Sequence, residues 1–275
     1  MSITLHLQTV PARNGVLWVR HGFKVFQRKP MSLLMLLLGF MFSGMVVALI
    51  PGIGSVLVLA ALPLVSLGFM LATHQILQGK RPTLTVFISP LKLTPQRRNT
   101  QLALGLAYAL ATIGIMALAD WIDEGALQNL QDLLSKGTVD PSALEAAMTD
   151  PRLLWGIVAR VGLLATLSVP FWHAPALVHW GGQGAMQALF SSTLGVWRNR
   201  AAFTVSALCW FGVMVSLCVI TSLILTLFEL PGAVPMMSLS LGLLLSTVFY
   251  ASLYFTFVDC FMFGAPRDLP LNEVA

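Results

Sequence analysis

Long apolar stretches separated by short polar ones dominate the chain. A helix of about 20 residues, rising 1.5 Å per residue, crosses the ~30 Å hydrocarbon core of a bilayer. Six stretches reach this length, and they cover approximately 31–50, 52–73, 100–119, 152–171, 201–228 and 236–257. The pattern predicts an all-α, polytopic bundle of six transmembrane helices, organised as one integral membrane domain over residues 1–275.

Three of the polar stretches mix cations with apolar residues at helical spacing: 13–29, 74–99 and 181–200. Basic amphipathic helices lie in the headgroup plane, with apolar side chains in lipid and cations on anionic phosphates. A solvated helix face is the alternative. We expect about three interfacial helices that bind anionic phospholipid headgroups through Arg20, Lys24, Arg28, Lys29, Arg97, Arg98, Arg198 and Arg200.

The loop 120–151 differs from these segments because it is acidic. Leucines and alanines recur in it at helical spacing, on either side of Asp140 and Pro141. Asp followed by Pro is typical of a helix start, because Asp caps the free N–H groups and Pro has none to lose. We expect two short amphipathic helices here, and a second Asp-Pro pair, at Asp150, starts the fourth span.

Composition and charge agree with a membrane location. Of the 275 residues 57% are hydrophobic and 10% are charged, and the mean hydropathy is +0.82. Soluble domains contain about 25% charged residues. Twelve Lys and Arg residues lie in the three basic segments, against Lys136 and Arg152 in or beside the acidic loop. Because cytoplasmic loops carry the excess of cations, we predict a bacterial inner-membrane protein with both termini in the cytoplasm and 120–151 outside.

The same order of segments occurs three times along the chain. Each time, an amphipathic segment and a basic cluster precede a pair of spans; the clusters end at Lys29, Asn99 and Arg200. One interpretation is a threefold repeat of an interfacial helix followed by a transmembrane hairpin. The other interpretation is that the three segments converged on a composition that suits entry into a membrane.

Four motifs resemble a family of uncharacterised six-span inner-membrane proteins of beta-proteobacteria. They are TVPARNGVLWV at 9–19, FWHAPALVHW at 171–180, WRN at 197–199 and SLYFTFVDCF at 252–261. The resemblance covers nearly the whole chain. It implies the fold and the location, and it implies no activity.

Arg160 is the costliest residue in the predicted spans. It lies eight residues beyond Arg152, about 12 Å into the membrane at helical rise. An unpaired cation at such depth costs at least ~2.5 kcal/mol. Asp120 and Glu229, near the outer ends of neighbouring spans, are the candidate partners. Three interpretations stay open: snorkelling to the outer headgroups, binding of an anionic group, and an internal ion pair.

Aromatic and imidazole rings crowd the end of the fourth span. The candidate binding residues there are Trp172, His173, His179 and Trp180, with Asp259 at the same level of the sixth span. Histidines six residues apart do not share a face of an unbroken helix, and without a third ligand they make a poor metal site. Anchoring by interfacial rings is one interpretation. The other is a kinked junction at which Asp259 contacts a histidine.

No motif in the chain points to catalysis. The sequence contains no Gly-x-Ser-x-Gly elbow, P-loop or His-Glu-x-x-His, so we expect neither an enzyme nor a bound cofactor. We also expect no nucleic-acid partner. The favoured function is a noncatalytic envelope component that organises lipid or partner proteins. The alternative is a small-molecule or lipid transporter with Arg160 in a polar cavity, and a cavity that reaches Arg160 would distinguish the two.

Overall fold

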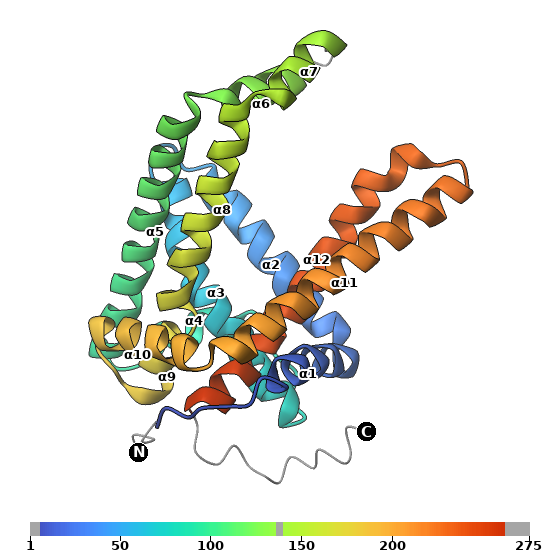
Figure 1. Cartoon of the computed structure of the whole chain (residues 1–275). Coiled ribbons are helices and arrows are strands. Elements are labelled where there is room, and N and C mark those ends of the chain that lie inside the picture. The colour runs from blue at the N-terminus through green and yellow to red at the C-terminus, as the bar shows by residue number, and fades with distance from the viewer. Residues whose placement is uncertain (1–5, 136–139, 262–275) are drawn as a thin grey trace.

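The computed structural model describes residues 6–135 and 140–261, and every regular element within these ranges is a helix (Figure 1). Lys136 and the tail after Phe261 lie outside the described residues. Six helices are long and apolar enough to cross a membrane: α2 (Pro30–Ala48), α3 (Gly54–Leu77), α5 (Pro95–Asp123), α8 (Pro151–Phe171), α11 (Arg200–Leu227) and α12 (Val234–Phe261). The predicted fold class is confirmed for the described part of the chain.

Shorter helices connect the spans. They are α1 (Asn14–Arg28), α4 (Thr85–Ile88), η1 (Ser89–Lys92), α6 (Ala126–Ser135), α7 (Pro141–Thr149), α9 (Ala174–Gly181), α10 (Ala185–Arg198) and η2 (Pro231–Ala233). At least one short helix thus precedes each pair of spans. The threefold repeat itself stays a prediction, because the order of elements does not test it.

Local sequence signals place several helix starts. The side chains of Asp140 and Asp150 accept the backbone N–H groups of Ser142 at 3.0 Å and Arg152 at 2.8 Å, and a proline follows each aspartate. The start of α5 differs, because Thr94 makes no capping bond with its side chain. Proline therefore marks this start without help from a cap.

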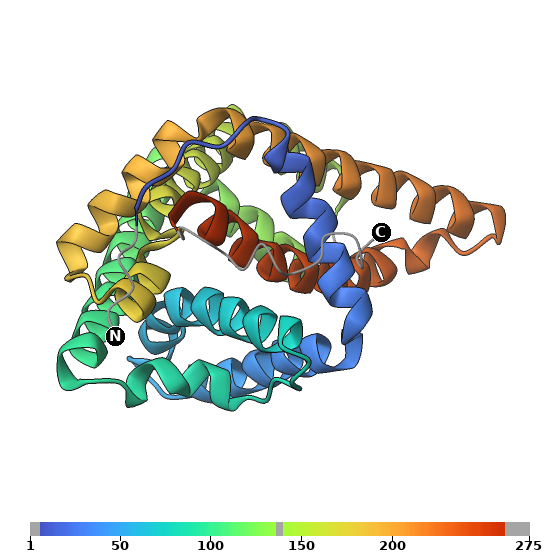
Figure 2. The same cartoon turned by 90° about the horizontal axis from the view of Figure 1, so that it is seen from below.

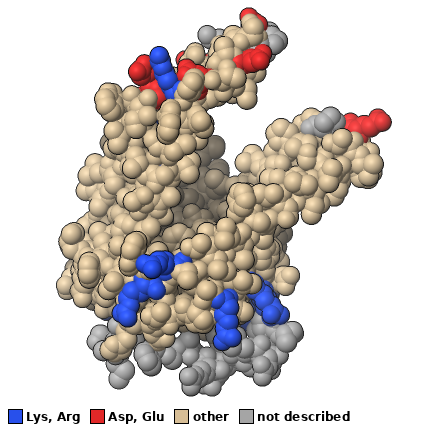
Figure 3. Space-filling view, in the orientation of Figure 1, with Lys and Arg blue, Asp and Glu red and all other residues tan. Residues whose placement is uncertain are grey.

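The helices form two arms that diverge from a common end, which we call the base. Figure 1 shows the α5–α8 arm, with α6 and α7 at its tip, and the α11–α12 arm; the α2–α3 hairpin lies behind them. The base contains residues 6–13, α1, α4, α9 and α10, together with the adjoining ends of the long helices. Seen from below, α1 crosses the base between the α2–α3 hairpin and the α11–α12 arm (Figure 2). The arms are separated by a hollow in the space-filling view (Figure 3).

Buried apolar side chains concentrate toward the base. One cluster joins α1, α9 and the end of α12 around Trp18, Leu177 and Phe257, all fully buried. A second joins α2, α3 and part of α1 around Phe69. At the tip of the α11–α12 arm the pattern reverses, since Leu227 is 81% exposed. The outer parts of the helices therefore present apolar side chains to lipid.

The prediction that α1 lies with its apolar side in lipid is wrong in part. The helix packs across α11 and α12 and buries one face against them. Added Cβ atoms on Gly15 and Gly22 would lie 2.3 Å and 2.8 Å from the carbonyl oxygens of Ala202 and Val248. These glycines let the backbones approach closely. Part of the apolar surface, such as Val16, stays exposed.

Charges separate along the length of the molecule. Figure 3 shows lysines and arginines on the base and aspartates and glutamates at the tips of the arms, with some basic surface beside the acidic residues on the α5–α8 arm. This distribution agrees with the separation of basic and acidic segments in the sequence.

Candidate functional site

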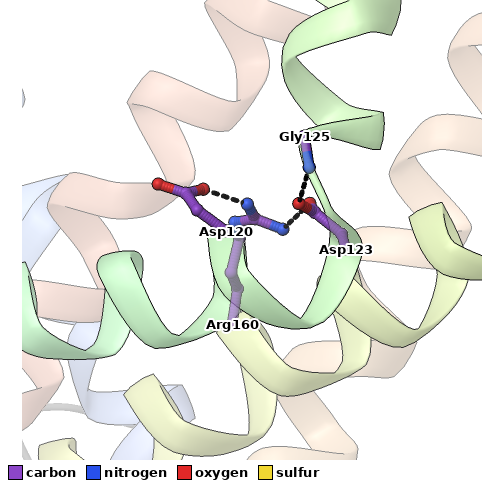
Figure 4. Close-up of polar contacts among 4 residues, drawn as sticks. All are labelled: Asp120, Asp123, Gly125 and Arg160. Atoms are coloured by element: carbon purple, nitrogen blue, oxygen red, sulfur yellow. Dashed lines mark hydrogen bonds and ion pairs between the residues drawn. The ribbon is translucent and has the colours of Figure 1, made fainter.

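Arg160 of α8 lies against α5 and is paired with two carboxylates (Figure 4). Its Nη1 donates to Oδ2 of Asp123 at 2.6 Å, and its Nη2 donates to Asp120. The two aspartates lie three residues apart on α5 and so share a face. Arg160 is only 8% exposed and Asp123 is fully buried. Of the three interpretations, the structure therefore contains the internal ion pair. Glu229, the other candidate partner, makes none of the ion pairs of the described residues.

The backbone around the ion pair fits it closely. Oδ1 of Asp123 accepts the N–H of Gly125 at 2.9 Å, in a turn where Glu124 has a φ of 49°. A Cβ at Gly156 would lie 2.5 Å from the Cβ of Asp123 and 2.8 Å from Nη1 of Arg160. Glycine at this position thus leaves room for the pair. The buried cluster carries a net charge of −1, with its excess carboxylate, Asp120, half exposed.

A hydroxyl group bridges the break between α8 and α9. The N–H of His173 donates to Oγ of Ser192 at 3.0 Å, and this Oγ donates to the carbonyl of Val169 at 3.0 Å. In an unbroken helix the N–H would reach the Val169 carbonyl directly. Ser192 of α10 is therefore inserted into the hydrogen-bond ladder, which is a recognised cause of a sharp bend. The predicted kink is present, two residues before Pro175.

The imidazole of His173 faces α12. Nε2 lies 3.0 Å from Oγ1 of Thr256, whose own proton is donated to the Leu253 carbonyl at 2.8 Å. Thr256 must then accept, which places the proton of the neutral imidazole on Nε2. Trp172 also donates to Thr256, at 3.4 Å. The prediction that Asp259 contacts a histidine of this motif is wrong, since Thr256 takes that place for His173.

His179 and Trp180 lie beside the same end of α12. The backbone carbonyl of His179 accepts from Nη1 of Arg97 at 3.0 Å, which ties α9 to α5. Trp180 stacks on Phe257 with ring centroids 5.1 Å apart. His179 also packs edge-on against Trp180, at 5.1 Å. Both rings act as packing groups within the base.

Asp259 binds α1 instead of the histidines. Its Oδ2 accepts Nδ2 of Asn14 at 2.8 Å and Nε1 of Trp18 at 2.6 Å. Burial lowers the pKa of His21, one turn farther along α1, and the nearby charge of Asp259 opposes this shift. The contact joins residues 245 positions apart in the chain. Sequence reasoning missed it because it placed α1 in the lipid interface.

Asn199 connects the residues before α1 to the ends of α10 and α12. It accepts the N–H of Val10 at 2.8 Å through Oδ1, and its Nδ2 donates to the carbonyl of Gln8 at 2.9 Å. The N–H of Gln8 in turn donates to the Cys260 carbonyl at 2.8 Å. With the contacts of Asp259 and His173, all four motifs that carry the family resemblance meet in the base.

Arg160 is absent from the lining of two cavities formed by described residues. One, of about 160 Å³, lies where α3, α5, α8 and α12 approach one another, and its polar lining includes Tyr108 and Ser168. The other is an open groove of about 760 Å³ between α1, α11 and α12. No group of three His, Cys, Asp or Glu side chains suited to a metal ion occurs within 6–135 and 140–261.

Six apolar helices long enough to cross a bilayer make this chain a multi-pass membrane protein. It is 28% identical over 267 residues to a protein of Burkholderia thailandensis described as "Probable inner membrane protein BTH_II0599", with 96% of this chain and 97% of that protein covered. The similarity supports the resemblance to a family of inner-membrane proteins and leaves open which motifs mark it. No protein-family model matches the chain. No solved structure matches it significantly.

Proposed function

We propose that the protein is a noncatalytic component of the inner membrane that gathers anionic phospholipids around its base. Three polar side chains in or beside the spans join helices: buried Arg160 joins α8 to α5, buried His173 joins the α8–α9 break to α12, and half-buried Asp259 joins α12 to α1. None of these groups is arranged as a nucleophile with an adjacent base. Because these side chains hold helices together, we place the function in the polar side chains of the surface.

The observation that carries the proposal is the difference between paired and unpaired cations. Among the described residues, ion pairs are formed only by Arg152 and Arg160, both in the α5–α8 arm. The cations of the base form none with any carboxylate of the described residues. An unpaired cation at the membrane surface attracts anionic lipid by about 1 kcal/mol. Several of them on one face would concentrate such lipid in a single leaflet.

The proposal requires the base to face the cytoplasm, as the excess of cations predicts. Single cysteines at positions 92 and 132, in a chain whose three native cysteines are replaced, test this orientation. We expect a membrane-impermeant maleimide to label Asp132→Cys in intact cells and Lys92→Cys only after the membrane is opened. Labelling of Lys92→Cys from outside would overturn the orientation.

Lipid selectivity is the direct test of the function. In liposomes of phosphatidylcholine, electron paramagnetic resonance measures the immobilised fraction of a small amount of spin-labelled lipid. We expect a larger immobilised fraction for phosphatidylglycerol than for phosphatidylcholine, with the difference reduced by salt. Replacing the exposed Arg20, Arg28, Arg98, Arg198 and Arg200 by glutamine should remove most of this difference. Equal immobilised fractions for both lipids with the native chain would refute the proposal.

Transport is the competing function, and it requires Arg160 in a polar cavity. Both terminal nitrogens of Arg160 are occupied by aspartates, and the residue lines neither cavity described above. These contacts favour a structural use of the charge. Uptake or lipid-flipping assays in the same liposomes are the control, and we expect rates equal to those of protein-free vesicles.

A further inference from the structure

A long apolar groove opens between α1 and α11. Its volume is about 760 Å³. Its lining residues are Val16, Val19, Arg20, Cys209, Gly212, Val213, Ser216, Leu217, Ile220, Thr221 and Leu241. From Cys209 to Thr221 the groove follows α11 for twelve residues, or about 18 Å at helical rise. One leaflet of a ~30 Å hydrocarbon core has a similar depth.

Arg20 is the only charged residue of the groove. It lies on α1 in the base, while most of the lining extends along α11 toward the tip of the arm. Arg20 is exposed and forms no ion pair with any described carboxylate. Lys24 follows four residues later on α1, so the two cations share a face. The groove thus has an apolar length and a cationic end.

We propose that this groove binds one anionic phospholipid, with an acyl chain along α11 and the phosphate on Arg20. The inference rests on the proposed function and assigns it a specific site. The apolar lining fits an acyl chain, and a guanidinium forms paired hydrogen bonds with phosphate oxygens. A zwitterionic lipid would also place a phosphate at Arg20, but its ammonium would approach Lys24. Charge complementarity therefore selects a lipid with a net negative headgroup.

Two substitutions address the two ends of the site without disturbing the core. Arg20→Gln removes the cation from an exposed position. Gly212→Leu fills the groove, and no heavy atom lies within 4 Å of a Cβ built at Gly212, so the new side chain enters open space. Arg152→Gln is the matched control for the loss of an exposed cation, because Arg152 lies at the tip of the α5–α8 arm and outside the groove. Gly162→Leu is the matched control on α8, because Gly162 is likewise unobstructed and lies outside the groove.

Native mass spectrometry of the full chain in neutral detergent, titrated with phosphatidylglycerol or phosphatidylcholine, measures binding of the first lipid. We expect the native chain and both controls to bind one phosphatidylglycerol more tightly than phosphatidylcholine. Arg20→Gln should weaken this step by about 10- to 100-fold, since a hydrogen bond to a charged group is lost. Gly212→Leu should weaken the binding of both lipids.

If the Gly212→Leu variant binds both lipids as tightly as the native chain does, the proposed site is wrong. A dimer of the native chain that Gly212→Leu dissociates would also overturn the site, because the groove would then be a contact between two copies. If the native chain immobilises anionic spin-labelled lipid and neither variant changes the first binding step, the groove assignment fails while the proposed function stands. If the native chain has no anionic preference in either assay, both proposals fail.

Discussion

The base and the tip of the α5–α8 arm are stabilised by different kinds of contact. In the base, helices from the whole length of the chain pack around buried rings, and several separate hydrogen bonds join them. Near the tip, two neighbouring helices expose most of their large apolar side chains, and the buried polar contact between them is the cluster of Arg160. The base resembles the core of a globular domain, whereas the arm depends on lipid for its surroundings.

This difference follows from the solvent. Between helices in lipid there is no hydrophobic driving force, so association needs close packing or polar contacts. The base obtains close packing from glycines such as Gly15 and Gly22. At the outer end of the α5–α8 arm, a buried ion cluster accompanies the close approach of the helices at Gly156. We therefore expect substitutions at many positions of the base to lower the unfolding free energy, whereas in the arm the largest loss should come from the Arg160 cluster.

The largest effect is expected from Arg160→Leu. It leaves Asp123 buried without a counter-charge, and breaking a buried pair in this way costs about 3–5 kcal/mol. Unfolding in mixed SDS micelles measures the loss, and adding Asp123→Asn should restore part of it. Arg152→Leu is the control, because its pair with Glu124 is exposed and we expect a change within about 1 kcal/mol. Equally small losses for both would mean that the cluster does not hold the arm.

Two leucines of α5 compare the base with the arm directly. Leu104 is fully buried in the base, whereas Leu118 is 44% exposed. Leu104→Ala leaves a cavity and should cost about 2–5 kcal/mol of unfolding free energy. Leu118→Ala should cost less than about 0.5 kcal/mol, as exposed positions do. A similar loss at both positions would remove the contrast.

The contact of Asp259 with α1 should give a smaller but specific effect. In a double-mutant cycle with Trp18→Phe and Asp259→Asn, we expect a coupling of about 1.5–3 kcal/mol, typical of a hydrogen bond to a charged group. The matching cycle of His173→Ala with Asp259→Asn should give a coupling near zero. If the two values were reversed, the predicted contact between Asp259 and His173 would be supported instead.

The hydroxyl inserted into α8 gives the smallest of the four effects. Ser192→Ala leaves the His173 N–H and the Val169 carbonyl without their bridge, at a cost of about 1–3 kcal/mol. Ser191→Ala, its neighbour on α10, should leave the unfolding free energy unchanged. If Ser192→Ala is equally neutral, the backbone closes the gap by itself and the bridge is dispensable.

Much of the fold could be predicted because the bilayer imposes a simple rule on sequence. Apolar runs and Asp-Pro or single proline signals locate six spans to within several residues. The exact end of α5 was not predictable in this way. The helix continues past 119 to Asp123, so an acidic residue counted with the outer loop becomes the buried partner of Arg160. A charged residue at the end of a span, such as Asp123, looks in the sequence like part of the following polar loop.

The base was harder to predict for a different reason. Its contacts join segments far apart in the chain, and the periodicity of one helix does not identify the helix that it meets. A signal was present on α1, where Gly15, Trp18 and Gly22 share one face. Small residues at such spacing indicate close helix packing in membranes. The same composition also fits an interfacial helix, so the sequence alone does not link Asp259 to α1.

The bond between Asn14 and Asp259 also orders events during synthesis. The two residues are 245 positions apart, and ribosomes add about 5–20 residues per second, so Asn14 precedes its partner by roughly 10–50 s. Trp18, which donates to the same carboxylate, precedes it almost as long. Throughout that interval α1 exists without α12, one of the two helices that it packs against. The packing of the base is therefore completed only after the last span has been translated.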